Sequence, residues 1–331
     1  MLDRVLLLSA SAGAGHVRAA QALERAFRDA GAAHEVRHVD VLEHTTALFR
    51  RLYSGVYLDL VNNAPEVLGW LYEYLDSPWK HERRRLAFDK LNMRPFVRLL
   101  ETYRPQWTVC THFLPAEIIS WLRSQGRLEA RQAVVLTDLD VHAMWLHRQV
   151  DRYFVALDET REHLRALGFP ADRITVSGIP IDPVFAVPKE SRAMRVRHGL
   201  EPDRATILVS AGGFGVGPVE RLVEALRGLR HPAQVVVICG RAAELKLRLD
   251  RLATTMPPGS PVALHVVGYT TEMDEYMAAA DLLVGKPGGL TTSEALARGL
   301  PRRAAGCRGG VTETAGDAIG LCGCLLIPDT S

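Results

Sequence analysis

Short apolar runs alternate with amphipathic stretches along most of the chain. Residues 5–9 and 35–41 have the length and composition of buried strands, and apolar positions from Val17 to Phe27 between them follow helical spacing. Further strand-like runs lie at residues 107–111, 133–137 and 153–157. This alternation is typical of a parallel sheet that is covered by helices.

A second series of the same kind begins at residue 204. Its strand-like runs are residues 205–210, 233–239, 262–267 and 282–285. Prolines make residues 177–188 a stiff connector between the two series. We therefore expect an α/β protein with two doubly wound Rossmann-like domains facing a cleft: residues 1–180, a linker at 181–203, and residues 204–301.

The segment from His44 to Arg104 departs from this rhythm, because it is helical in pattern and rich in aromatic residues. Aromatic side chains beside clustered basic ones suit a helix lying on an anionic bilayer. The residues expected to dock there are Trp79, Lys80, Arg83, Arg84 and Arg85. The alternative is a helical insertion with an aromatic core and a solvated charged face.

Composition narrows the classes of function. The chain has 331 residues, 47% of them hydrophobic, and a formal net charge of +2, so its charge does not indicate a nucleic-acid partner. No apolar run reaches the length of about 18 residues that a spanning helix needs, and no signal-peptide layout is present. Five cysteines, an odd number, favour free thiols in the cytosol, and Cys322-Gly-Cys324 lacks the spacing of a zinc pair.

A glycine-rich turn with a histidine follows the first strand. Gly13 and Gly15 allow a ligand to approach the backbone, and His16 lies in the first turn of the helix, whose dipole favours a neutral imidazole. We expect His16 either to accept a proton or to hydrogen-bond nearby backbone. A dinucleotide fingerprint would need glycine at Arg18, with Asp40 as its ribose acid, so that match is partial.

Two glycine-rich turns in the second half predict a diphosphate site. Gly212 and Gly213 follow one strand, and the stretch 285–301 follows another and opens a helix. The second turn contributes Lys286, Gly288, Gly289, Thr291, Thr292 and Glu294. Thr291 and Glu294 have the spacing of a capping box, so Glu294 either caps the helix or binds ribose hydroxyls.

Polar side chains also follow two strands of the first half. Asp138, Asp140, His142 and Trp145 follow one strand, and His112 follows another. The carboxyl ends of parallel strands are where open α/β sheets bind ligands. We therefore place these side chains in the same site as the first glycine turn.

The motifs occur in an order that resembles one family, the monogalactosyldiacylglycerol synthases and processive diacylglycerol glucosyltransferases. The motifs that carry the resemblance are Gly13-Ala-Gly-His16, Thr111-His-Phe-Leu-Pro-Ala-Glu117, Thr137-Asp-Leu-Asp-Val-His-Ala-Met-Trp145, Asp151-Arg-Tyr-Phe-Val-Ala156, Ser177-Gly-Ile-Pro180 and Lys286-Pro-Gly-Gly-Leu-Thr-Thr-Ser-Glu-Ala295.

The resemblance implies a GT-B fold and inverting transfer from UDP-glucose or UDP-galactose to diacylglycerol or glycosyl-diacylglycerol. It implies His16 as the base, with Asp138 and His142 as competitors, and a UDP-sugar held by the second domain. It also implies catalysis without a metal or other cofactor. The expected location is the cytoplasm, peripherally on the inner face of the cell membrane.

The family pattern stops after Pro301. Residues 302–331 are rich in glycine and cysteine, and they lack an apolar run before residue 325. We expect an atypical, truncated or frame-shifted tail that leaves the second domain incomplete, without its last strand. The alternatives to an active transferase are a non-catalytic lipid-surface homologue, a UDP-sugar epimerase and, on the partial fingerprint, a Rossmann dehydrogenase.

Overall fold

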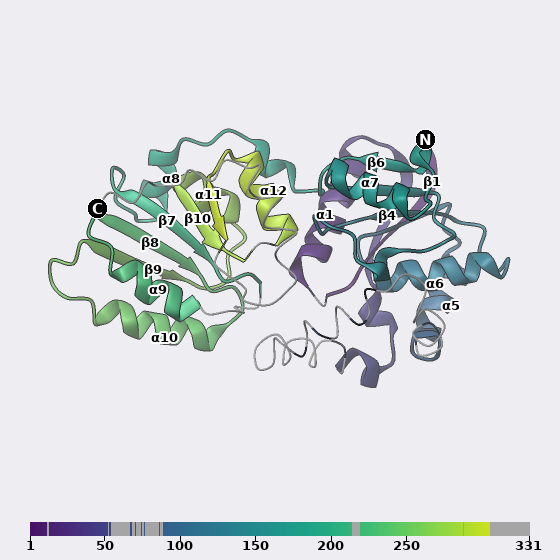
Figure 1. The fold of residues 1–331 in the computed structure, drawn as a ribbon, viewed down its shortest axis with the longest axis horizontal. Coiled ribbons are helices and arrows are strands. Elements are labelled where there is room, and N and C mark those ends of the chain that lie inside the picture. Colours follow the sequence, from purple (N-terminus) through teal and green to yellow (C-terminus); the bar gives the residue numbers. More distant parts are fainter. Residues whose placement is uncertain are drawn as a thin grey trace. The chain divides into compact units, whose positions relative to one another are not determined.

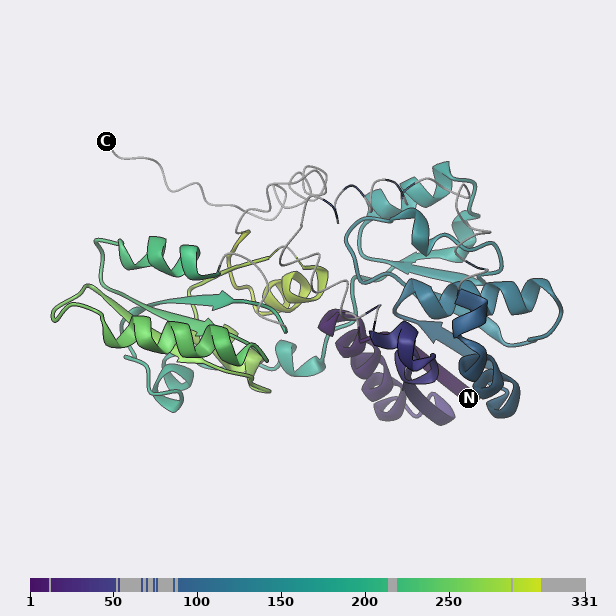
Figure 2. The ribbon, with the colours of Figure 1, turned by 90° about the horizontal axis from the view of Figure 1, so that it is seen from below.

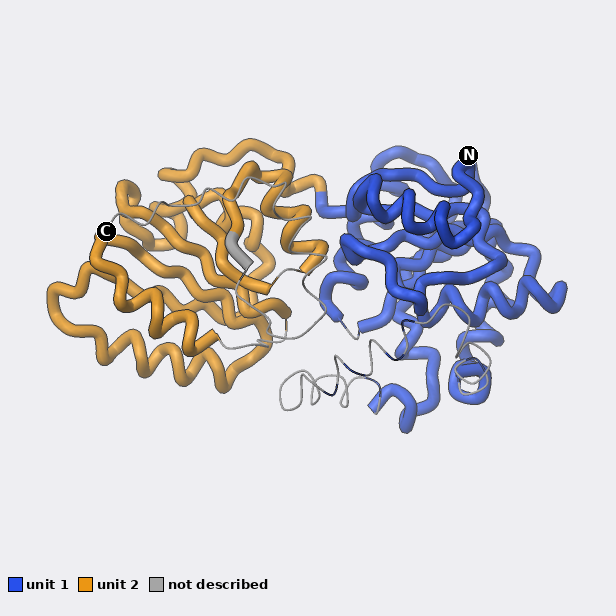
Figure 3. Tube along the Cα trace, viewed as in Figure 1, with its two compact units in different colours: residues 1–182 blue, residues 183–331 orange. Residues whose placement is uncertain are grey.

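The structure is a computed structural model that divides into two compact units, Met1–Asp182 (unit 1) and Pro183–Ser331 (unit 2) (Figure 3). The described residues are 1–11, 13–51, 53, 67, 70, 74, 76, 86, 89–213, 219–286 and 288–304.

Unit 1 is built on a six-stranded parallel sheet with the order β2-β1-β3-β4-β5-β6 (Figure 1). Its strands are β1 (Leu2–Ser9), β2 (Ala33–Asp40), β3 (Trp107–Cys110), β4 (Arg131–Val135), β5 (Arg152–Val155) and β6 (Ile174–Val176). Its helices are α1 (Ala14–Asp29), η1 (Val41–His44), α5 (Arg94–Tyr103), α6 (Phe113–Ser124), η2 (Ala143–Trp145), α7 (Asp158–Ala166) and η3 (Ala171–Arg173). The sequence predicts the first five strands, whereas β6 was not predicted.

Helices bury both faces of the unit 1 sheet. Successive side chains of a strand point to opposite faces, so Val5 and Leu7 of β1 share a cluster with Phe27 of α1. Leu6 and Leu8 belong to a second cluster, which includes residues of α5 and α6. A strand buried on both faces reads as a continuous apolar run, and this explains why the sequence predicts β1.

Unit 2 is built on a five-stranded parallel sheet with the order β11-β10-β7-β8-β9. Its strands are β7 (Ala205–Ser210), β8 (Ala233–Ile238), β9 (Val262–Val267), β10 (Leu282–Gly285) and β11 (Arg302–Ala304). Its helices are η4 (Pro183–Ala186), α8 (Ser191–Arg197), α9 (Val219–Arg227), α10 (Ala243–Thr254), α11 (Met273–Ala279) and α12 (Gly289–Ala297). Figures 1 and 2 show α9 and α10 together on one face of this sheet, with α8, α11 and α12 on the other. The GT-B-like expectation of two parallel sheets is thus confirmed.

Residues 181–203, expected from the sequence to be a linker, contain η4 and α8, and from Pro183 they belong to unit 2. Lys189 Nζ lies 2.5 Å from a carboxylate oxygen of the buried Asp274 on α11. Arg298, which follows α12, donates a 3.0 Å hydrogen bond to the Val184 carbonyl oxygen and another to that of Val187. This segment is therefore fastened to α11 and α12.

The expectation that no strand follows the last helix is wrong for residues 302–304. These residues form β11, which pairs with β10 in parallel, Gly285 opposite Ala304. β11 is the outermost strand of its sheet, where the backbone supplies the pairing and polar side chains are common. An apolar pattern is therefore a poor guide to such a strand. The rest of the atypical tail lies outside the described residues.

Candidate active site

His16 lies at the carboxyl edge of the unit 1 sheet, in the first turn of α1. Its Nδ1 atom is 2.9 Å from the Thr111 carbonyl oxygen and 2.7 Å from the Thr137 hydroxyl oxygen. Thr111 directly follows β3, and Thr137 follows β4 by two residues. The ends of three neighbouring strands thus meet at one imidazole.

Burial of the His16 ring lowers its pKa below the ordinary value, because the charged form loses hydration. The negative charge of Asp138 and the hydrogen bond to Thr111 raise the pKa, but by less than burial lowers it. The imidazole is therefore neutral at pH 7. A neutral imidazole is the form that accepts a proton.

His112 packs its ring edge-on against His16, with 4.6 Å between ring centroids. Its Nδ1 atom accepts the backbone N–H of Leu114 at 3.1 Å and caps the N-terminus of α6. Burial, followed by the neighbouring His16, lowers the pKa of His112 well below its usual value. Since Nδ1 is occupied and the ring is buried, His112 shapes the site and holds α6.

Two of the four side chains expected from residues 137–145 lie close to His16. Trp145 is buried, with its ring centroid 6.2 Å from that of His16, and its indole N–H donates to Asp138 at 3.2 Å. His142 instead caps η2 by accepting the backbone N–H of Met144 at 3.2 Å. Asp140 is likewise engaged locally: it is exposed and accepts the N–H of Val141 at 2.7 Å.

Gly13 leaves one side of the His16 ring open. A Cβ placed on Gly13 would lie 3.4 Å from Cδ2 of His16 and 3.7 Å from Nε2. Gly15 is half-buried in the first turn of α1. Asp40 accepts the backbone N–H groups of Ser11 and Leu42 at 3.1 Å each, so in this structure it closes the loop after β1.

In unit 2, α12 begins earlier than the proposed capping box requires. Its N-cap is Gly288, which makes no side-chain capping bond, so Thr291 lies inside the helix and the capping box is wrong. Glu294 is buried in the second turn, beyond reach of the N-cap. Thr292 donates its hydroxyl to the Gly288 carbonyl oxygen at 2.8 Å, and this leaves the first N–H groups of α12 uncapped by side chains.

The sequence analysis missed another glycine of unit 2, Gly240, which follows β8. It adopts φ +60°, and a Cβ there would lie 2.5 Å from the Gly212 carbonyl oxygen and 2.8 Å from that of Gly213. The Arg241 backbone N–H also donates to the Gly213 carbonyl oxygen at 3.1 Å. Gly240 is therefore the support on which the glycine turn after β7 rests.

Tyr269 was also missed. It follows β9 at the carboxyl edge of the unit 2 sheet and is a highly exposed aromatic residue. The guanidinium of Arg241 lies 5.3 Å from the centre of its ring. The sequence signal is an aromatic residue placed directly after a strand and a glycine.

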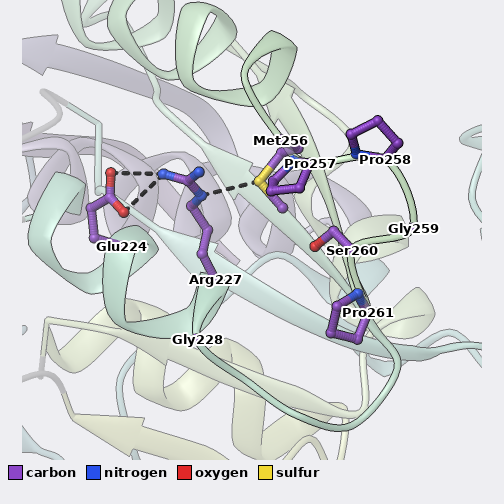
Figure 4. Close-up of a pocket in the computed structure, with 9 residues that line it drawn as sticks. All are labelled: Glu224, Arg227, Gly228, Met256, Pro257, Pro258, Gly259, Ser260 and Pro261. Carbon is purple, nitrogen blue, oxygen red and sulfur yellow. Dashed lines mark hydrogen bonds and ion pairs between the residues drawn. The ribbon is translucent and has the colours of Figure 1, made fainter.

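A hollow of about 480 Å³ lies at the opposite edge of the unit 2 sheet, between the end of α9 and the turn before β9 (Figure 4). The residues that line it are Glu224, Arg227, Gly228, Met256, Pro257, Pro258, Gly259, Ser260 and Pro261. Arg227 donates to both carboxylate oxygens of Glu224 at 2.9 Å and to Met256 Sδ at 3.0 Å. The charged groups that line this hollow thus pair with each other. The hollow is not part of the candidate site.

Within the described part of the chain, His198, Glu272 and Glu275 place possible metal-ligand atoms within 4.8 Å of one another. Cationic side chains already surround it, because Arg197 lies 3.0 Å and Lys189 3.7 Å from Glu275 oxygens. An ion-pair network accounts for this grouping. The expected docking residues Trp79, Lys80, Arg83, Arg84 and Arg85 lie outside the described residues.

Comparisons with known proteins match both halves of the chain to known families. Residues 16–181 match the model of the monogalactosyldiacylglycerol (MGDG) synthase family, and residues 206–302 match that of the glycosyltransferase family 28 C-terminal domain. The chain is 30% identical over 302 residues to the processive diacylglycerol beta-glucosyltransferase of Staphylococcus aureus (strain Newman). This match covers 90% of the chain and 74% of the relative, and the protein of strain bovine RF122 / ET3-1 matches equally.

Solved structures resemble the chain in fold. Acinetobacter baumannii MurG matches with a TM-score of 0.56 at 14% identity, covering 97% of this chain and 84% of that one. Anabaena Alr3699/HepE in complex with UDP-glucose gives 0.53 at 13% identity, over 96% and 89%. UDP-GlcNAc 2-epimerase from Neisseria meningitidis gives 0.54 at 12% identity, over 96% and 85%. Because their sequences are at most 14% identical to this chain, these likenesses describe the fold alone.

Proposed function

The chain belongs to the family of MGDG synthases and processive diacylglycerol glucosyltransferases, and we propose that it transfers a hexose from a UDP-sugar to diacylglycerol or glycosyl-diacylglycerol. Inversion at the sugar carbon requires a base for the acceptor hydroxyl and stabilisation of the departing UDP. The two glycine-bearing sheet edges, one in each unit, offer groups for these two tasks. UDP-glucose and UDP-galactose are the donors to test.

The observation that carries the proposal is the neutral, half-buried His16 beside a glycine, Gly13, that puts no side chain against its ring. His16 takes the proton of the acceptor hydroxyl as the oxygen attacks the sugar. The charge of Asp138, which raises the pKa of His16, stabilises the imidazolium that forms. Trp145 holds Asp138 in place through the indole N–H.

The donor is held in unit 2 by backbone. The uncapped N-terminus of α12, at Gly288 and Gly289, offers N–H groups and the positive end of the helix dipole to the diphosphate. Thr291, Thr292 and Lys286 flank that turn, and Glu294 is the residue we propose for the ribose hydroxyls. Donors of this kind stabilise the leaving group without a metal ion, so the reaction should proceed in EDTA.

The turn at Gly212 and Gly213, supported by Gly240, completes the donor site at the neighbouring strand end. Tyr269 offers an exposed ring on which a nucleobase can stack, as aromatic side chains do elsewhere for bases. The site we propose thus extends across the carboxyl edge of the sheet from α12 towards β9.

The acceptor is a membrane lipid, so we propose that the chain works peripherally on the inner face of the cell membrane. Exposed apolar side chains support this: Leu48 is 69% and Trp70 63% exposed, and Trp70 stacks on Tyr74 at 5.6 Å. Arg50 and Arg51, next to Leu48, are also exposed. Within the described residues no helix is long and apolar enough to cross a bilayer.

The test is a transfer assay with radiolabelled UDP-glucose or UDP-galactose and liposomes that contain diacylglycerol. We expect labelled glycolipid from one donor, and at least about 100-fold less from His16→Ala, since general base catalysis contributes that much. Turnover of the sugar nucleotide without lipid would favour an epimerase. Vesicle binding without UDP binding would identify a non-catalytic homologue, and wild-type transfer by His16→Ala would refute the role of His16.

A further inference from the structure

We propose that Thr137 is a positioning residue, which, together with the Thr111 carbonyl, holds His16 in the tautomer with the proton on Nδ1 and the lone pair on Nε2. This inference rests on the proposed function, in which His16 is the base. It adds to that function the reason why one ring nitrogen, Nε2, takes the proton.

The chemistry of the two groups that contact Nδ1, the Thr111 carbonyl and the Thr137 hydroxyl, decides the tautomer of His16. A carbonyl oxygen can only accept a hydrogen bond, and that of Thr111 lies 2.9 Å from Nδ1. If Nδ1 carried no proton, two lone pairs would face each other at that distance. Nδ1 therefore carries the proton, and the Thr137 oxygen at 2.7 Å is the second acceptor of the same N–H.

Both partners are held by the sheet. The Thr111 hydroxyl lies 2.8 Å from the His16 carbonyl oxygen and 3.3 Å from that of Leu8, and the Thr111 backbone N–H donates to Leu8 at 2.9 Å. Thr137 is buried directly beyond β4. These contacts anchor the ring from the ends of β1, β3 and β4, so it cannot turn over without breaking them.

The remaining nitrogen, Nε2, lies on the side of the ring beside Gly13, where a Cβ on that glycine would come within 3.4 Å of Cδ2 and 3.7 Å of Nε2. In the transfer the acceptor O–H bond breaks and its proton moves to Nε2. The acceptor oxygen bonds to the sugar carbon, and the bond from that carbon to the UDP oxygen breaks, with its electron pair leaving on UDP. Nδ1–H keeps both acceptors throughout, so the ring does not have to reorient.

The other groups that face His16 do not change the tautomer that we assign to it. His112, at the N-terminus of α6, is neutral and presents a ring edge. Asp138, beyond β4, contributes a negative charge that stabilises the protonated ring without a direct hydrogen bond among those observed. Neither group competes for Nδ1.

The experiment reads the tautomer directly by long-range ¹H–¹⁵N NMR of the imidazole nitrogens, assigned with His16→Gln. In the full-length wild type we expect the His16 Nδ1–H form. Thr137→Val removes one of the two acceptors while the Thr111 carbonyl remains, so it should raise the fraction of the Nε2–H form, with kcat lowered about threefold to tenfold and KM for the UDP-sugar unchanged. Thr137→Ser keeps the hydroxyl and should restore both readouts.

Thr160→Val is the matched control, because Thr160 is a buried threonine of the same unit whose hydroxyl donates to the Leu139 carbonyl oxygen at 2.6 Å. It should leave the His16 signals and kcat unchanged. A wild-type Nε2–H tautomer would overturn the inference, as would a Thr137→Val protein with wild-type tautomer and kcat. If the wild type transfers no sugar, the proposed function fails, while the tautomer is still measured.

Discussion

Replacing Gly240 by alanine tests whether the glycine turn after β7 binds the donor. The new Cβ would lie 2.5 Å from the Gly212 carbonyl oxygen, and ordinary contact begins near 3.4 Å. One backbone segment therefore has to move by about 0.9 Å to restore ordinary contact. Since backbone carbonyls have no rotamers to escape into, the turn itself has to move.

The free-energy cost has two parts. An alanine at positive φ costs about 1–2 kcal/mol, and overpacking adds about 1–3 kcal/mol. Gly259→Ala is the matched control, because Gly259 has φ +79° and nothing within 4 Å of its Cβ position. We expect a loss of unfolding free energy of about 1–2 kcal/mol for Gly259→Ala and about 2–5 kcal/mol for Gly240→Ala.

Urea denaturation measures these losses, and calorimetric titration with UDP measures the consequence for binding. We expect Gly240→Ala to weaken UDP binding at least about tenfold, since displaced hydrogen-bond donors lose most of their strength, while Gly259→Ala binds as the wild type does. Equal losses of unfolding free energy in the two variants, or wild-type UDP affinity in Gly240→Ala, would refute the reasoning.

Three further changes test parts of unit 1. Gly13→Ala should fold normally, because Gly13 has the extended φ of −143°, but its Cβ at 3.7 Å from His16 Nε2 should lower kcat about tenfold; an unchanged kcat contradicts this. Burial lowers the pKa of His16 and His112, so the unfolded state binds protons first and the unfolding free energy should fall as pH drops below about 6.5. Urea titrations from pH 8 to pH 5 measure how far the unfolding free energy falls. His112→Asn, which keeps a capping oxygen, should reduce that fall. An equal fall in His112→Asn and the wild type would contradict the prediction. Leu48→Ser should weaken sedimentation with anionic vesicles about fivefold or more, whereas Leu247→Ser, a change at a residue 57% exposed in unit 2, should not; equal effects would point to non-specific adhesion.

The sequence predicts the parts of this fold that local patterns encode. Strands such as β1, buried on both faces, appear as apolar runs, and glycines directly after a strand mark the turns at residues 13–15 and 212–213. The ordered motifs identify the family, which both family models and the Staphylococcus aureus relatives confirm.

Features that depend on contacts between distant segments could not be predicted. Gly240 acquires its role by meeting Gly212, and Thr137 by meeting His16; neither distance is visible in a linear pattern. The capping box failed because its spacing recurs inside a helix, where Gly288 had already taken the N-cap position. The roles of individual site residues stay predictions until the variants are measured.

The attachment of residues 183–190 to α11 and α12 determines where this chain can be recombined with a relative. A chimaera joined between Asp182 and Pro183 keeps Lys189 with Asp274, and Arg298 with the Val184 carbonyl oxygen. A junction near residue 203 takes Lys189 away from the buried Asp274 and leaves Arg298, 3.5 Å from the carboxylate, as its remaining cationic neighbour from unit 2. Exchange of donor specificity between family members should therefore transfer everything from residue 183 onward as one module.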